Sequence, residues 1–401
     1  MVRADFIIEH AVLIATCAGP APRRGSAQRD ISPFRNAVIA SRNGTIVHVG
    51  PESSRSGIDL DAGGVSLDAA GCTVVPGFVD PHTHAVYAGN RHDELRERGI
   101  LQTVTATRAA TGDELLESAR TRLDAMLACG TTTCEIKSGY GLTTDSELLQ
   151  LRVIRQLNDE HPIDVVPTFL GAHEVPEEYW IRPDDYVALV INEMIPRVAA
   201  EQLAVWCDVF CEEGAFALQE SVDILTAGAR AGLKPRIHAN ELAASGGTHV
   251  AVKVKARSAD HLIFVGEAEA AALADAGICA VLLPAAALSL KAGRFAPARM
   301  LIDRGVPVAL GTDLNPGAGL SPSMPFAMTL ACFEMQMTLE EALIATTLNA
   351  AWSLDRSDSV GSLERGKVMD AVVIDGDLAD LLRVGPSPIR AVVKRGQVVY
   401  E

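Results

Sequence analysis

The middle of the chain alternates between two hydrophobic patterns. Residues 114–130 (ELLESARTRLDAMLACG) and 146–161 (SELLQLRVIRQLNDEH) carry apolar side chains at helical spacing, and Gly130 and Pro162 mark the ends of these predicted helices. Short apolar runs of strand length lie before and after them: VVPGFVD, TTTCEIKSG, DVVPTFLGAH, WCDVFCEE, KPRIHANE, SADHLIF, CAVLLP and PVALGTD. About eight strands that alternate with helices predict an α/β fold with a closed, TIM-like (β/α)8 barrel.

Both ends of the chain show a different pattern, in which short strands are joined by turns. The N-terminal end contains FIIEHAVLIAT and AVIASRNGTIVHVG, where Asn43-Gly44 predicts a hairpin turn. Between these strands, residues 19–33 are rich in Pro, Gly and Arg and are expected to form a surface loop. We predict one small β-sandwich domain from residues 1–73 and 355–401, and a barrel from residues 74–354.

Composition narrows the possible partners and location. The 401 residues are 48% hydrophobic and carry a net charge of −16, which argues against nucleic acid or an anionic membrane as a partner. No apolar run approaches the roughly 18–20 residues of a membrane span. Asp5 and Glu9 stand where a secretory signal would be basic, so we expect a cytoplasmic protein. The eight cysteines show no Cys-x-x-Cys pair and are expected to be reduced and mostly buried.

The segment VVPGFVDPHTH, residues 74–84, is the most informative motif. An apolar strand ends on Asp80-Pro81 and is followed by His82 and His84, separated by one residue. Positions i and i+2 of an extended chain point to the same side, so both imidazoles can approach one divalent metal ion. The alternative is an ordinary strand end with two solvated histidines.

Other polar residues follow the remaining barrel strands, where barrel enzymes place their active sites. They are Glu135, Lys137, His173, His238, His261 and Asp313. His82, His84, His238 and Asp313 would form a metal site with room for a water molecule. Glu241, three residues beyond His238, is placed to accept a proton from that water, or alternatively is a helix N-terminal acid. The other histidines are expected to be structural: His10, His48, His92, His161 and His249.

These motifs resemble those of the amidohydrolase superfamily, and more narrowly those of the imidazolonepropionase family. PGFVDPHTH is specific to the superfamily alone. The narrower resemblance depends on HTHAVYAGNR, TVTATRAA, EIKSGYGL, FLGAHEVP, IHANE, SADHL and GTDLNPG, which are spread over the whole barrel.

The resemblance implies hydrolysis of 4-imidazolone-5-propanoate to N-formimidoyl-L-glutamate by a homodimer. One Zn2+ or Fe3+ ion would bind to the positions of His82, His84, His238 and Asp313. Glu241 matches the acid–base residue, and His261 matches a histidine beside the attacking water. The matching substrate contacts, of which Arg91 would bind the propionate carboxylate, are Arg91, Tyr140, His173, Glu241, Asn315, Gly317 and Ala318.

Three departures from the family pattern bear on the substrate. The segment after Arg91 is shorter than usual, Asn240 replaces an aspartate, and Ala318 replaces a hydroxyl residue. The same chemistry on a related ring, such as a hydantoin propionate or an amino-heterocycle, is therefore the alternative. A noncatalytic barrel scaffold is a more remote one, because scaffolds typically lose their metal ligands.

Overall fold

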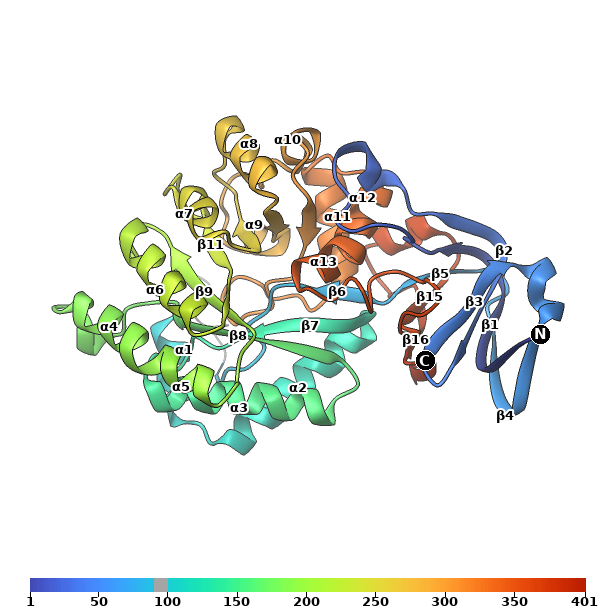
Figure 1. Cartoon of the computed structure of the whole chain (residues 1–401), viewed down its shortest axis with the longest axis horizontal. Helices are drawn as coiled ribbons and strands as arrows, with labels where there is room; N and C mark the ends of the chain where they lie inside the picture. The colour runs from blue at the N-terminus through green and yellow to red at the C-terminus, as the bar shows by residue number, and fades with distance from the viewer. Residues whose placement is uncertain (90–99) are drawn as a thin grey trace.

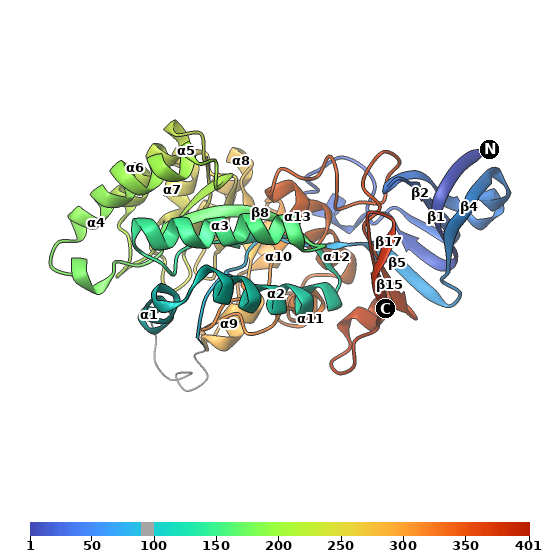
Figure 2. The same cartoon turned by 90° about the horizontal axis from the view of Figure 1, so that it is seen from below.

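A computed structural model describes residues 1–89 and 100–401. The chain forms a barrel surrounded by helices and, at one end of the molecule, a mixed sheet that contains both termini (Figures 1 and 2). The (β/α)8 barrel is therefore confirmed, and so is a separate β-structure built from both ends, which is one mixed sheet.

Eight parallel strands form the barrel in the described part of the chain. Neighbouring strands along the chain are hydrogen-bonded in sequence order, and the short strand β10 (Lys234–Pro235) adds to β9. The barrel strands are β6 (Phe78–Asp80), β7 (Thr131–Lys137), β8 (Asp164–Ala172), β9 (Trp206–Cys211), β11 (Ile237–Ala239), β12 (Ser258–His261), β13 (Cys279–Leu282) and β14 (Val308–Leu310). All eight runs read as strands from the sequence are strands.

The seam between the first and last barrel strands closes just beyond their carboxyl ends. Thr83 and Leu314 form a parallel bridge. The Asp313 amide donates to the His82 carbonyl at 3.0 Å, and the His84 amide donates to the Leu314 carbonyl at 2.9 Å. The residues that close the barrel are thus the candidate metal ligands and their neighbours.

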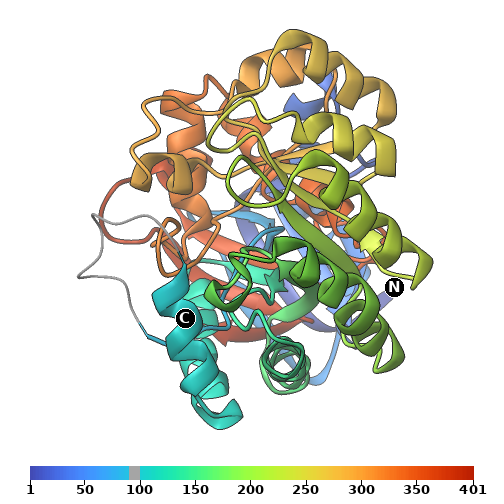
Figure 3. The ribbon, with the colours of Figure 1, turned by 90° about the vertical axis from the view of Figure 1, so that its left-hand side faces the viewer.

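Helices cover the outside of the barrel (Figure 3). They are α1 (Leu101–Ala109), α2 (Gly112–Ala128), α3 (Thr144–Glu160), α4 (Pro183–Leu189), α5 (Ile195–Ala200), α6 (Leu218–Arg230), α7 (Gly247–Val254), α8 (Glu267–Ala276), α9 (Pro284–Ser289), α10 (Ala298–Asp303), α11 (Met324–Glu334), α12 (Leu339–Ala345) and α13 (Leu348–Ser353). Helices α2 and α3 are the two predicted from helical spacing. Thr111 caps α2 in a capping box with Glu114, and Gly130, at φ 89°, follows the helix end as expected.

The terminal segments form one mixed sheet. Its strands are β1 (Val2–Ala15), β2 (Pro33–Arg42), β3 (Thr45–Pro51), β4 (Ile58–Asp68), β5 (Cys72–Pro76), β15 (Ala371–Asp375), β16 (Ile389–Lys394) and β17 (Gln397–Tyr400). The long strand β1 pairs with β2 on one side and with β4 and then β5 on the other. The predicted hairpin turn has Asn43 and Gly44 at φ 50° and 73°, which are the positive values that such turns require.

The passage from sheet to barrel occurs at Gly77. Strand β5 pairs with β15 as far as Pro76, and β6 begins two residues later at Phe78. A Cβ atom on Gly77 would lie 2.2 Å from Thr132 Oγ1, so only glycine fits between the sheet and the second barrel strand.

Residues 19–33 correct the expectation of a simple surface loop. Gln28 is fully buried, and its side-chain amide donates to the carbonyls of Val308 and Glu341 at 3.2 and 3.3 Å. The Arg23 amide donates to Asn349 Oδ1 at 2.8 Å. The composition of this segment indicated a connection between two strands, and the segment contains a short 3-10 helix at Gly25–Arg29. Its packing on the barrel depends on partners about 300 residues away in the chain.

The described cysteines are all free, and most are buried, as expected. Within the same residues, no helix is both long and apolar enough to cross a membrane.

Lys394 joins the sheet to the barrel in a buried ion pair, which gives a stability prediction. Its Nζ lies 2.6 Å from Asp370 and 2.7 Å from Asp164 of β8, and Lys394 and Asp370 are each 3% exposed. Lys394→Met leaves the buried Asp370 carboxylate without its cation and should lower the free energy of unfolding by about 3 kcal/mol. Denaturant unfolding measures this change, and adding Asp370→Asn should recover part of it. A loss below about 0.5 kcal/mol would mean that the pair does not stabilise the junction.

Candidate metal centre and active site

His82 and His84 lie immediately beyond β6 and are held there by β7. Thr83, between them, donates through its amide to Glu135 Oε2 at 3.2 Å and through its hydroxyl to the Glu135 carbonyl at 2.7 Å. The Lys137 amide donates to the Thr83 carbonyl at 2.9 Å. These three bonds fix the backbone of the motif, so both histidines occupy defined positions on the same edge of the barrel.

The four predicted metal ligands meet in one buried cluster. Nε2 of His82 and Nε2 of His84 each lie 3.5 Å from Asp313 Oδ1, and the His82 and His238 ring centres are 4.6 Å apart. Ligand atoms of His82, His84 and His238 lie within 4.8 Å of one another.

Unpaired polar atoms in this cluster fit a bound cation. His82 Nε2, His238 Nε2 and Asp313 Oδ1 are buried and have no hydrogen-bond partner among the described residues. Buried polar atoms are normally paired, so three converging lone pairs need a bound group. Imidazole nitrogens with one carboxylate oxygen are a donor set for a transition-metal ion, and the cluster can therefore hold a metal ion.

Two aspartates orient two of the predicted ligand histidines by contacting their Nδ1 atoms. Asp260 on β12 lies 2.7 Å from His82 Nδ1, and Asp208 on β9 lies 3.1 Å from His238 Nδ1. A carboxylate at Nδ1 fixes the proton there and leaves Nε2 free for a metal. Neither residue was predicted from the sequence. The sequence feature that could have identified them is a single acidic residue within an otherwise apolar strand, such as Asp208 in WCDVFC.

Protonation states follow from burial. Burial holds the pKa of both His82 and His84 well below the usual range, so these rings are neutral, as metal ligands must be. For His238, burial lowers the pKa, but the charge of Asp208 outweighs this and the pKa is raised. Burial raises the pKa of Asp313 to about 7.

Glu241 and His261 stand side by side at the cluster. His261 Nδ1 lies 3.4 Å from Glu241 Oε1. Burial, and then the charge of Asp313, raise the pKa of Glu241 to about 8. Glu212, which the sequence analysis missed, accepts from the amides of Glu241 and Leu242 at 2.9 and 3.0 Å and anchors this turn. A carboxyl with a pKa near neutrality can both accept and return a proton.

Tyr140 and His173 form a wall beside His84. The His173 ring stacks on His84 with centres 5.0 Å apart, and Tyr140 lies 5.3 Å from His173. His173 Nδ1 donates to the Gly139 carbonyl at 3.0 Å, while burial lowers the pKa of His173 to about 3. The neutral ring therefore keeps Nε2 as an acceptor.

A buried glutamate on α3 shapes the loop that carries Tyr140. Glu147 accepts from the amides of Gly139, Gly141 and Leu142 at 3.0, 2.8 and 2.8 Å. The motif SGYGL thus folds around a carboxylate supplied by the next helix. Its helical pattern gave no sign of this role.

Asn315, Gly317 and Ala318 belong to one tight turn after β14. The Asn315 amide group donates to the Asp313 carbonyl at 2.8 Å, and its side-chain oxygen accepts from the amides of Gly317 and Ala318 at 2.8 and 2.7 Å. The turn therefore lies next to the metal cluster, and the Asn315 side chain determines its shape.

One predicted substrate contact and the histidines expected to be structural are not part of the described cluster. Arg91 and His92 are outside the described residues. His10 pairs with Asp68 and His48 with Ser54. His161 contacts Asp124 at 3.2 Å, and His249 is on α7.

The hydrogen-bond partners of the Asn240 side chain explain why this position carries an amide and not a carboxylate. It adopts φ 54°, a left-handed conformation that Asn tolerates well. The amide donates to the Phe264 carbonyl at 3.0 Å and to Glu269 Oε1 at 3.1 Å. An aspartate could not donate to Glu269.

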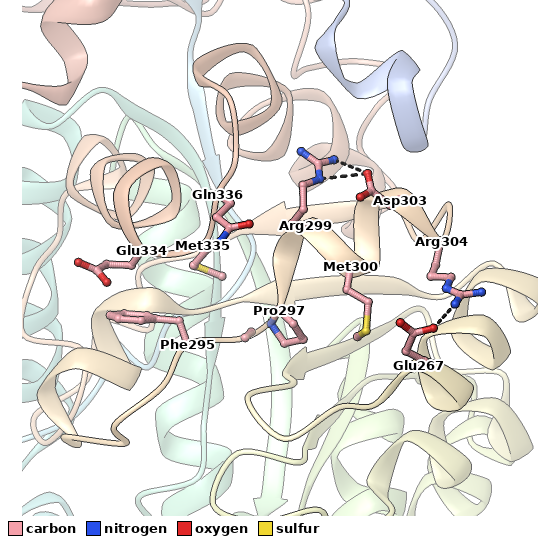
Figure 4. Close-up of a pocket in the computed structure, with 11 residues that line it drawn as sticks. Glu267, Phe295, Pro297, Arg299, Met300, Asp303, Arg304, Glu334, Met335 and Gln336 are labelled. Atoms are coloured by element: carbon pink, nitrogen blue, oxygen red, sulfur yellow. Dashed lines mark hydrogen bonds and ion pairs between the residues drawn. The ribbon is translucent and has the colours of Figure 1, made fainter.

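A large surface cavity of about 510 Å3 lies away from this cluster, between α10 and the ends of α8 and α11 (Figure 4). Its two arginines are paired, Arg304 with Glu267 and Arg299 with Asp303. With its cations paired and no histidine or cysteine in its lining, this cavity does not rival the histidine cluster as a catalytic site.

Sequence comparisons place the chain among known proteins. A model of the amidohydrolase family matches residues 219–399. The imidazolonepropionase of Alkaliphilus metalliredigens is 42% identical, with 99% of this chain and 98% of the relative covered. That of Haloarcula marismortui is 45% identical, with 95% and 93% covered.

The chain belongs to the imidazolonepropionase family. It is therefore a hydrolase of the amidohydrolase superfamily, as its motifs predicted. Solved structures with the same fold include an adenosine deaminase from Xanthomonas campestris with bound zinc, at a TM-score of 0.72 and 18% identity over 99% of this chain and 93% of that chain. Guanine deaminase from E. coli superposes with a TM-score of 0.73 at 17% identity, with 99% of both chains covered. At these identities the likeness shows the fold alone.

A change of charge at position 240 tests the hydrogen bond between Asn240 and Glu269. Asn240→Asp places a second carboxylate against Glu269 and should lower stability by about 1–2 kcal/mol, measured by denaturant unfolding. Adding Glu269→Gln restores a donor and should recover most of the loss. A double variant no more stable than the single one would show that Glu269 does not determine the residue at this position.

Proposed function

We propose that this protein hydrolyses 4-imidazolone-5-propanoate to N-formimidoyl-L-glutamate, in the degradation of histidine. The observation that carries the proposal is the convergence of His82, His84, His238 and Asp313 beside Glu241, in a chain of the imidazolonepropionase family. Such a site activates water, and the family membership indicates which cyclic amide the water attacks.

The four ligand residues would hold one Zn2+ or Fe3+ ion, since both accept imidazole and carboxylate ligands. When bound, this ion supplies Lewis acidity, which lowers the pKa of water and polarises a carbonyl. Asp260 and Asp208 orient the His82 and His238 imidazoles, and the bond from the Thr83 amide to Glu135 holds the backbone between His82 and His84.

Glu241 would transfer the proton. Its carboxylate takes a proton from the water as the water oxygen attacks the ring carbonyl carbon. It then returns the proton to the ring nitrogen as the amide C–N bond breaks, giving the formimidoyl amine and a carboxylic acid, which loses its proton to become the carboxylate. His261, 3.4 Å away, is placed to stabilise the negative charge that develops on the carbonyl oxygen.

Substrate recognition would come from the surrounding loops. Tyr140 and the unprotonated Nε2 of His173 offer hydrogen-bonding groups to the ring. Arg91 would bind the propionate carboxylate bidentately, and the turn of Asn315, Gly317 and Ala318 would contact the glutamate end of the product. The family resemblance also supports a homodimer in the cytoplasm.

A direct assay tests the proposal. Metal-loaded protein is incubated with freshly prepared 4-imidazolone-5-propanoate, and N-formimidoyl-L-glutamate is measured. Production of this compound is expected. Failure to form it, together with turnover of a hydantoin propionate or an aminopurine, would assign the same site to the alternative substrates. If the protein turns over none of these compounds, the result would favour the alternative of a noncatalytic barrel scaffold.

Glu241→Gln tests the acid–base role. The amide cannot accept the proton, so turnover should fall about 10²–10⁴-fold while the metal content stays at the wild-type level. Steady-state kinetics and metal analysis measure the two quantities. Glu341→Gln is the matched control, because Glu341 is also a buried glutamate but pairs with Arg29 and Arg299 and not with the candidate metal cluster. Full activity of Glu241→Gln would assign the proton transfer to another residue.

Arg91→Ala tests the carboxylate contact. Loss of a charge-assisted hydrogen-bond pair should raise KM about 10–100-fold with a smaller effect on kcat. Arg3→Ala serves as the control, since Arg3 lies in the terminal sheet and pairs with Asp61 there. An unchanged KM would remove Arg91 from the substrate site.

A further inference from the structure

Lys137 lies at the centre of a buried cluster of carboxylates below the candidate metal site. Its Nζ is 2.7 Å from Glu135 Oε1, 2.8 Å from Asp208 Oδ2 and 3.9 Å from Asp260 Oδ2. All four side chains have no solvent exposure. A fully buried lysine is rare and requires compensating charges.

Each of these carboxylates holds a different part of the metal site. Glu135 accepts from the amide of Thr83, between His82 and His84, at 3.2 Å. Asp208 bonds His238 Nδ1 at 3.1 Å, and Asp260 bonds His82 Nδ1 at 2.7 Å. One ammonium group therefore connects the supports of all three histidine ligands.

A second cation, Arg236, does not replace Lys137. Its guanidinium lies 3.4 Å from Asp260 but donates mainly to the carbonyls of Pro81 and Ser353, at 2.9 and 3.1 Å. Without Lys137, Glu135 and Asp208 would be buried without a close cation. Like charges in a volume closed to water would then protonate or move apart.

We propose that Lys137 is a positioning residue that holds Glu135, Asp208 and Asp260 in place and thereby aligns the histidine ligands on one metal ion. This inference rests on the proposed metal-dependent function. Charge alone predicts the opposite effect, because removing a cation near a cation site should strengthen metal binding. The sign of the change in metal affinity therefore separates positioning from simple electrostatics.

The test is the affinity of Lys137→Met for Co2+ and Zn2+, measured by competition with a chelator and by the Co2+ absorption spectrum, without substrate. We expect affinity 10–100-fold weaker than wild type and an altered spectrum, as for other groups that orient metal-binding histidines. Lys394→Met is the control. It also loses a buried lysine between two aspartates, but it lies outside this cluster, so its metal affinity and spectrum should match wild type.

Unchanged or tighter metal binding by Lys137→Met would overturn the inference. If Lys137→Met does not fold, Lys137→Gln, which keeps a hydrogen-bond donor, is measured instead and judged by the same two outcomes. Failure of the wild-type protein to bind either metal would instead overturn the proposed function. Metal binding by wild type without turnover of the imidazolone would leave the role of Lys137 intact and change only the substrate.

Discussion

The active end of this barrel depends on the balance of buried charge. A metal ligand set of three histidines and one aspartate is useful only if the histidines are neutral and their free nitrogens point to one place. Here, burial holds His82 and His84 in the neutral form, while carboxylates at Nδ1 of His82 and His238 orient those two rings, and these carboxylates are themselves buried. Lys137 and Arg236 supply the compensating positive charge. The ligands, their supports and the cations beneath them therefore form a single structural unit.

The same region also closes the barrel. His82, His84 and Asp313 lie on the two sides of the seam between β6 and β14, and their backbone bonds join the first strand to the last. Asp313 and His261 adopt φ values of 51° and 74°, in the left-handed region that such residues seldom occupy. Strain at strand ends is maintained because the closed barrel fixes both sides of each turn. Barrel closure and ligand geometry are thus one constraint.

The sequence predicted most of the fold, because periodicity reports which faces are buried. All eight barrel strands, helices α2 and α3 and the Asn43-Gly44 turn follow from local patterns. The residues aligned at strand ends were also found locally. Asp208, Asp260, Glu147 and Glu212 were missed because each acts on a residue from another element. Their roles exist only once the barrel brings those elements together. The packing of Gln28 under α12 was missed for the same reason.

Catalysis and recognition are therefore encoded differently in this chain. The proposed ligand and acid–base residues are at or just beyond strand ends, where the barrel determines the geometry and a short motif identifies them. The proposed recognition residues are in loops, where a side chain can act through the backbone it shapes. Asn315 shows this: both ends of its side chain bond within its own turn. A substitution there would change the position of Asp313 as well as any substrate contact. Asn240 is a different case. It departs from the family pattern, and its side-chain amide donates to Glu269 on α8 and not to a residue of the candidate metal cluster. A departure from a motif therefore bears on the substrate only when the side chain faces the cluster.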